Sequence, residues 1–174
     1  MLDDIDNIKY ELHVAVDGLP GGVAESKKLL AEKGFSAIVK KDNYDIPTNY
    51  FLAGTEDGSA GKALELRKKI EAYQADMLTY AKSDAYKKQL KNMQIITEGT
   101  WKDAQGQDKN WQMYNFYHTI ITADMVLLNK FKSEIQNAEM DLVNHLYSQI
   151  SADDFKFDQV VARVLPKSTY IIQG

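Results

Sequence analysis

The side chains best suited to chemistry in this chain are three histidines and a large set of carboxylates. The histidines are His13, His118 and His145, and no two of them lie three or four residues apart. Helical zinc sites need ligands at that spacing, and no H-E-x-x-H motif occurs. We therefore expect no metal site and no cofactor, and we interpret His145 as a surface or interface residue of a long helix.

The carboxylates and hydroxyls do not form a recognisable catalytic set. Glu139 and Asp141 point to different faces of a helix, so they cannot converge as an acid–base pair. Asp153 and Asp154 are expected in a turn that follows a helix. The chain has no cysteine nucleophile, and no G-x-S-x-G elbow is present. The sequence therefore predicts no catalytic residue, and a protein that is not an enzyme.

A glycine-rich stretch, GTEDGSAGKALEL (residues 54–66), partly matches a phosphate-binding loop. That loop requires G-x-x-x-x-G-K-[ST], but Glu56 stands at the first glycine and Ala63 replaces the hydroxyl that holds Mg²⁺. A glutamate repels phosphate, and an alanine cannot bind a metal ion. We interpret the three glycines as a flexible entry to a helix. A nucleotide-dependent enzyme built on this loop is the least favoured function.

An aromatic run, WQMYNFY (residues 111–117), has three interpretations. It could stack a base or a glycan, anchor a protein interface, or pack in a core. Lys+Arg 21 against Asp+Glu 25 gives a net charge of -4, so no basic field attracts nucleic acid. Core packing is favoured, and tyrosine and tryptophan are also preferred interface anchors. The candidate interface residues are Trp111, Tyr114, Tyr117 and His145.

The elements that position these residues are mainly helices. The composition, 44% hydrophobic and 26% charged over 174 residues, is typical of a globular domain. Apolar positions recur every three or four residues. They predict helices over about 3–16, 23–33, 59–80 (continuing weakly to 96) and 119–150, with an ordered loop over 35–61. The fold class is therefore all-α: an elongated helical bundle with long antiparallel helices that ends in a short extended segment.

Two boundaries are expected at the ends of the chain. Residues 1–152 are predicted to form a helical domain, and the β-branched, aromatic residues of 153–174 an extended segment. No apolar run reaches the roughly 18 residues that span a bilayer. The start, MLDDIDNIKY, lacks the basic and apolar regions of a signal peptide. From these two absences we expect a soluble chain.

Several segments carry a resemblance to a known family. They are LLNKFKSEIQNAE (127–139), LYSQI (146–150) and PKSTYIIQG (166–174), with KDNYDIPTNYF (41–51) and GKALELRKKIE (61–71) in the middle. With these segments the chain resembles the GldM/PorM family of gliding-motility and type IX secretion proteins of Bacteroidetes. The matching segments are packing and turn signatures, and none of them is a catalytic motif.

The resemblance implies an architecture and a set of partners. Family members are inner-membrane proteins with a short N-terminal membrane helix, a helical periplasmic domain, and β-rich domains that form a long dimeric rod. With a GldL/PorL-type membrane partner they are thought to form a proton-driven motor. The rod reaches toward an outer periplasmic ring of GldK/PorK and GldN/PorN type. The resemblance thus implies a periplasmic homodimer, anchored to the inner membrane in the full-length protein. It also implies that the helical domain of residues 1–152 is truncated at its N-terminus and that residues 153–174 lead to a β-rich domain.

Three functions follow, in order of preference. The first is a non-catalytic structural module that transmits force within a gliding and type IX secretion motor. The second is a helical peptide- or ligand-binding module that uses the 35–61 loop and the Trp111–Tyr117 cluster. The third is the nucleotide-dependent enzyme on the glycine-rich loop.

Overall fold

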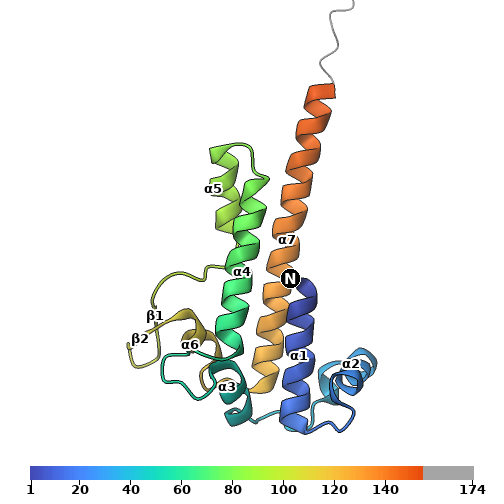
Figure 1. The fold of residues 1–174 in the computed structure, drawn as a ribbon, viewed down its shortest axis with the longest axis vertical. Helices are drawn as coiled ribbons and strands as arrows, with labels where there is room; N and C mark the ends of the chain where they lie inside the picture. The colour runs from blue at the N-terminus through green and yellow to red at the C-terminus, as the bar shows by residue number, and fades with distance from the viewer. Residues whose placement is uncertain (155–174) are drawn as a thin grey trace, which may run out of the picture. The chain divides into compact units, whose positions relative to one another are not determined.

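A computed structural model describes residues 1–154, and the side chains of residues 1–150. Within this part the chain is predominantly helical, which confirms the predicted all-α class (Figure 1). The helices are α1 (Leu2–Asp17), α2 (Gly22–Lys33), α3 (Asp45–Leu52), α4 (Lys62–Thr79), α5 (Asp84–Met93), α6 (Trp111–Phe116) and α7 (Ile121–Asp154). A 3-10 turn, η1, spans Gly34–Ala37, and a small hairpin pairs β1 (Trp101–Lys102) with β2 (Asp108–Lys109) antiparallel.

The chain divides into two units, Met1–Leu142 and Val143–Gly174. The first unit contains the hydrophobic core. The described part of the second unit consists of the last turns of α7, where the side chains of Val143, Tyr147 and Ile150 are largely exposed. The apolar positions of α7 at three- and four-residue spacing are therefore buried as far as Leu142, and Ile150 is exposed.

Three helices of the first unit lie side by side in Figure 1: α1, α4 and the first part of α7. Polar contacts along their flanks fix the register. Lys9 Nζ donates to Asn129 Oδ1 at 2.8 Å, and one turn away Lys132 pairs with Asp6. Lys69 pairs with Asp4 on the other flank of α1. Thus α1 runs antiparallel to both longer helices, and α4 and α7 are parallel to each other.

The core of this unit is made of aliphatic and aromatic side chains from every long helix. Its most deeply buried members include Leu12, Leu66, Ile70, Met125 and Leu128. These positions recur every three or four residues along their helices, which is the spacing that predicted the helices.

Aromatic rings fill the end of the core nearest α3 and α6. The rings of Phe51 and Phe116 stack with centroids 4.0 Å apart, and Trp111 stacks on Phe131 at 5.5 Å. Offset aromatic pairs of this kind add stability beyond the area they bury.

The 35–61 segment differs from its prediction as an ordered loop, because it contains helix α3. Pro47 lies in the first turn of α3, where a missing N–H costs no intrahelical hydrogen bond. Asn43 Oδ1 accepts from the N–H of Ile46 and supports the start of this helix. Proline and asparagine therefore mark a helix start here, and the prediction of a loop at these residues was wrong.

The end of α7 also differs from the sequence expectation. The helix ends at Asp154, so Asp153 and Asp154 lie within it and not in a turn. The rest of the predicted extended segment, residues 155–174, lies outside the described residues.

Candidate functional site

The most concentrated polar cluster in the described chain joins a histidine, a serine and an aspartate. His13 Nδ1 lies 3.0 Å from Ser26 Oγ, and its Nε2 lies 3.1 Å from Asp17 Oδ2. An ionised carboxylate only accepts hydrogen bonds, so Nε2 donates to Asp17. A neutral ring then accepts the Ser26 hydroxyl at Nδ1. The three side chains therefore form one continuous hydrogen-bonded chain between α1 and α2.

Asp17 extends this cluster to a third segment. Its carboxylate accepts the backbone N–H groups of Val39 at 2.9 Å and Lys40 at 3.0 Å. Burial alone would raise the pKa of Asp17, but these hydrogen bonds and His13 outweigh it and hold the pKa below its ordinary value. The ionised carboxylate is thus the common acceptor that joins α1 to the segment following η1.

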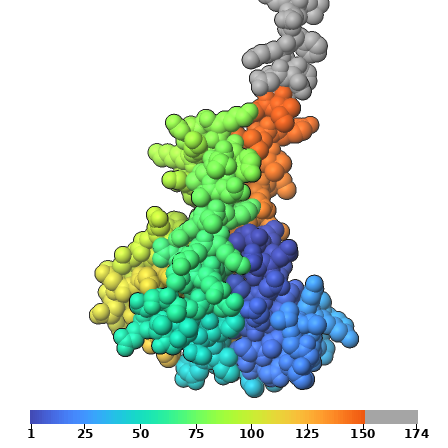
Figure 2. Space-filling view, in the orientation of Figure 1, coloured from blue at the N-terminus to red at the C-terminus, as the bar shows by residue number. Residues whose placement is uncertain are grey.

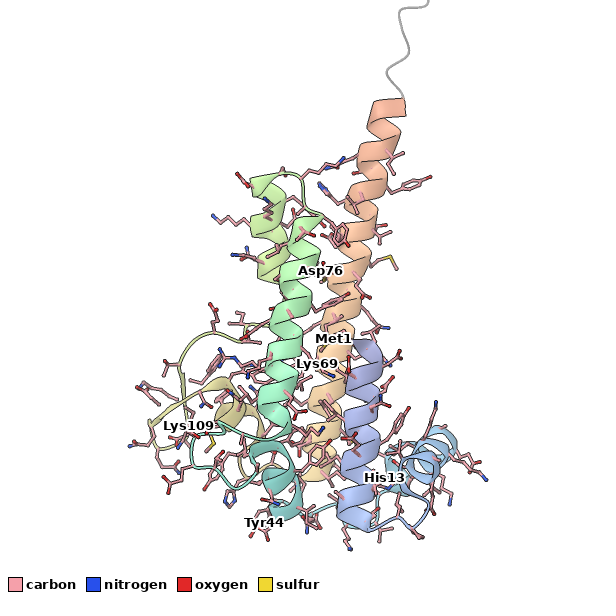
Figure 3. All side chains as sticks on the ribbon, in the orientation of Figure 1. Met1, His13, Tyr44, Lys69, Asp76 and Lys109 are labelled. Atoms are coloured by element: carbon pink, nitrogen blue, oxygen red, sulfur yellow. The ribbon has the colours of Figure 1, made fainter. Side chains whose placement is uncertain are left out.

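This cluster resembles a Ser–His–Asp catalytic triad only in composition. The side chains of His13 and Ser26 are 0% exposed, so a substrate has no path to the hydroxyl. Figure 3 shows His13 on the side of α1 that faces α2. Ser26 is the buried residue of α2, a helix that otherwise contributes only partly buried apolar side chains. The arrangement supports a structural role, in which the cluster fastens α2 to α1.

The glycine-rich loop of residues 54–66 has the structure of a helix entry. Gly61 is the N-cap of α4 with φ 86°, and a Cβ there would lie 2.5 Å from the carbonyl oxygen of Phe51. Lys62 pairs with Glu65 at 3.2 Å and with Glu11 at 3.8 Å. The lysine is engaged by carboxylates, which agrees with the helix-entry interpretation.

The predicted interface residues belong to both units and differ in exposure. Trp111 is 2% exposed and packs in the core, as the core-packing alternative predicts. Tyr114 and Tyr117 are about half exposed. His145 belongs to the second unit, where its Nε2 lies 2.8 Å from Gln149 Nε2. An interface role for the tyrosines and for His145 stays a prediction.

Tyr114 and Tyr117 border different cavities. The ring of Tyr114 stacks on Trp101, with centroids 5.9 Å apart, beside a cavity of about 270 Å³. Tyr117 borders a second cavity, of about 360 Å³, whose other walls include Thr48, Leu52 and Lys109. Lys109 Nζ lies 6.0 Å from the centre of the Tyr117 ring. This second cavity joins the 35–61 segment to the aromatic cluster, as the ligand-binding hypothesis requires.

A buried carboxylate at the start of α7 was missed by sequence reasoning. Asp124 is 1% exposed, and neither carboxylate oxygen has a well-aligned hydrogen-bond partner. Burial raises the pKa of Asp124 to about 7, and the nearby Thr119 hydroxyl offsets only part of that rise.

The sequence contained signals for two polar sites that sequence reasoning missed, the His13–Asp17 pair and Asp124. His13 and Asp17 lie four residues apart on one helix, and Asp124 lies on the apolar face defined by Ile121, Met125 and Leu128. Ser26 had no such signal, because only the packing of α2 brings it to His13. Among the described residues there is no group of three or more potential ligands that could hold a metal ion. None of the described helices is both long and apolar enough to cross a membrane.

Together these features define an all-helical domain with a buried polar cluster and open surface cavities. The chain belongs to the GldM family: the family model of the GldM N-terminal domain matches residues 3–149. It is thus related to components of gliding motility and type IX secretion, in a family of structural motor components associated with the membrane and the periplasm. Searches of curated proteins and of solved structures returned no match.

Proposed function

We propose that this chain is a non-catalytic, force-transmitting module in the periplasmic part of a proton-driven gliding and type IX secretion motor. The observation that carries the proposal is the family match over residues 3–149. In this proposal the module acts as a homodimer, in a protein anchored to the inner membrane. It works between a GldL/PorL-type membrane partner and ring proteins of GldK/PorK and GldN/PorN type.

The packing of the first unit supports a role under load. Lys69 and Lys132 hold α1 from two sides, and Tyr73 of α4 donates a hydrogen bond to Glu139 of α7. Burial, together with Glu139, raises the pKa of Tyr73 well above its ordinary value, so the hydroxyl keeps its proton. Such contacts resist sliding of one helix along another in addition to the apolar core.

A helix insertion tests this role. We would insert three glycines after Leu142, at the boundary of the two units within α7, in the native gene of a gliding bacterium of this family. A matched control carries the same insertion after Gln105, in the exposed turn of the β1–β2 hairpin. Glycine weakens a helix interior, so the first insertion interrupts the continuous helix and the second does not.

The expected result is loss of gliding and secretion in the first strain only, at equal protein level. Normal gliding in that strain would contradict force transmission through α7. Light scattering on the isolated chain tests the dimer separately, and a compact monomer would count against the shaft role.

The cavity beside Tyr117 favours a second candidate function, a peptide- or ligand-binding module. Its volume of about 360 Å³ falls in the range of small-molecule sites, and it combines Leu52 and Met113 with the charges of Glu56 and Lys109. Thermal-shift screening with glycans and periplasmic peptides tests this alternative. A ligand that stabilises the protein, and no longer does so after Tyr117→Ala, would support it.

A further inference from the structure

A large cavity of the first unit is a trough between α4 and α5. In Figure 1, α5 lies beside the C-terminal half of α4. The trough has a volume of about 610 Å³, and its α4 wall is formed by Ala75, Leu78 and Thr79. A neighbouring cavity of about 410 Å³ shares Ala75, Leu78 and Lys91 and continues along the same face of α4. The two cavities therefore form one continuous trough with an apolar floor.

The opposite wall of the trough is basic. Lys87, Lys88 and Lys91 line it from α5, spaced so that they share one face of the helix. Lys87 pairs with Asp84 at 3.5 Å, and the Asp84 side chain is 99% exposed, so this pair is weak. Lys88 and Lys91 form no ion pair with any residue that the structure describes.

This concentration of positive charge stands out because the whole chain carries a net charge of -4. Elsewhere in the first unit, Lys9, Lys69 and Lys132 lie between packed helices, and each of them pairs with an aspartate. Of the three α5 lysines beside the apolar floor, only Lys87 has an ion-pair partner, the exposed Asp84. A surface of this kind fits a partner that supplies both apolar side chains and carboxylates.

The charge changes sign along the trough. The end away from the α5 lysines is bordered by Glu71 and Glu98. Glu71 already pairs with Arg67 at 2.7 Å, while Glu98 is exposed. An occupant with carboxylates along its whole length would be repelled at this end. The trough therefore selects an occupant whose acidic residues are confined to the part that lies over α5.

The length of the α4 wall suits a short helical segment as the occupant. Residues 71–79 of α4 span roughly 12 Å at 1.5 Å per residue, which is the length of about two helical turns. Two antiparallel helices leave a groove that accepts a third helix, and the small Ala75 side chain permits close approach. Leucines at three- and four-residue spacing would contact Leu78, and glutamates beside them would reach Lys88 and Lys91.

We propose that the α4–α5 trough is a docking site for an amphipathic helix of another protein, with its acidic end over Lys87, Lys88 and Lys91. The site does not rest on the motor function, since the binding depends only on the trough and its charges. Within a secretion or motility apparatus it would give this domain a partner surface on α5, distinct from the packing of α1 and α7.

A designed peptide tests the proposal directly. The probe is a synthetic helical peptide with leucines on one face and glutamates flanking them in its first half, labelled for fluorescence anisotropy with the full chain. We expect micromolar binding at low ionic strength that weakens as salt is added. A second peptide, with glutamine in place of every glutamate, is expected to bind at least about tenfold more weakly.

A pair of matched variants separates the trough from general attraction. K88E/K91E reverses two exposed charges of α5, and K27E/K28E reverses two exposed charges of α2 by the same amount. We expect K88E/K91E to weaken peptide binding about tenfold or more, and K27E/K28E to change it less than about twofold. Leu78→Ser is expected to weaken binding without changing charge. Circular dichroism and urea unfolding check that each variant is folded.

Three results would overturn the proposal. The first is an equal loss of binding in both double variants, which would show nonspecific attraction. The second is equal binding of the glutamine peptide. The third is peptide-free self-association of the chain that K88E/K91E abolishes, which would show a second copy in the trough and not a different protein.

Discussion

Two aspartates of the first unit, Asp17 and Asp124, both have buried side chains, but their pKa values are shifted in opposite directions. Asp17 accepts hydrogen bonds from His13 and from two backbone N–H groups, and its pKa lies below the ordinary value. Asp124 has no well-aligned partner, and burial raises its pKa to about 7. Burial acts in the same direction on both carboxyl groups, so the difference comes from hydrogen bonding.

The comparison shows which of the two carboxylates stabilises the fold when it is ionised. The α1–α2 corner, around Asp17, needs its carboxylate ionised because three donors converge on it. The start of α7, around Asp124, is more stable when the carboxyl group is protonated. The same residue type therefore stabilises one region and destabilises the other at neutral pH.

Asp17→Ala is expected to have the largest effect. It leaves His13 and the N–H groups of Val39 and Lys40 without their acceptor, so we expect a loss of about 3–5 kcal/mol in the free energy of unfolding. Urea denaturation measures this loss. Asp76→Ala, at the exposed aspartate labelled in Figure 3, is the control and should change stability by less than about 0.5 kcal/mol. Equal losses in the two variants would refute the structural role of the cluster.

Asp124→Asn should have the opposite sign. The folded pKa of about 7 lies above the unfolded value of about 3.9, so the folded protein binds more protons between these pH values. The contribution of protonated Asp124 to the free energy of unfolding is therefore lost as the pH rises from about 4 to about 7. Asparagine cannot ionise, so the variant should gain about 2–4 kcal/mol at pH 8 and almost nothing near pH 4. A gain that is the same at both pH values would show that ionisation is not the cause.

Asp17→Asn sharpens the comparison through its pH dependence. The folded pKa of Asp17 is depressed, so its stabilisation is present above the unfolded value of about 3.9 and is lost as the pH falls through the folded pKa. We expect the variant to be about 2 kcal/mol less stable than the native chain at pH 7, with the gap closing in acid. Unfolding midpoints measured across this pH range give the slope. A gap that widens in acid would contradict this assignment.

Ser26→Ala should have the smallest effect, about 1 kcal/mol, because only one hydrogen bond to His13 is lost. Hydrogen exchange of α2 amides is the sensitive measurement, since local opening of α2 should increase while α4 keeps its protection. Ser59→Ala, at an exposed serine before α4, is the control. Unchanged exchange in α2 would show that Ser26 does not help to fasten this helix.

The sequence predicted the long helices well, because their apolar periodicity is the direct signature of a buried face. The bounds of α2 agree to within one residue, since Gly34 follows it with a positive φ of 56°. Helix α3 was missed because proline and asparagine have the same local signal in a loop and in a first helical turn.

The polar sites were harder to predict than the helices. Asp124 lies on an apolar helix face, but an aspartate in the first turn of a helix is ordinary, because the helix dipole favours it there. Its position therefore did not identify it as an unusual carboxyl group. Its lack of partners depends on tertiary packing. Likewise, the contact of Ser26 with His13 depends on how α2 folds back on α1, which periodicity does not encode. Figure 2 shows α2 and the 97–110 segment on opposite flanks of the α1–α4 pair.

The antiparallel register of α1 and α7 has a mechanical consequence. The contacts Lys9–Asn129 and Asp6–Lys132 place Met1 beside the turn of α7 near residue 137, close to the Leu142 end of the first unit. Tension applied in an optical trap between residues 1 and 142 would peel α1 away one turn at a time. Handles at residues 17 and 142 would load all of these contacts together in shear, and the rupture force should be several times higher. The direction of pull, and not the number of contacts, would then decide how much load this unit withstands.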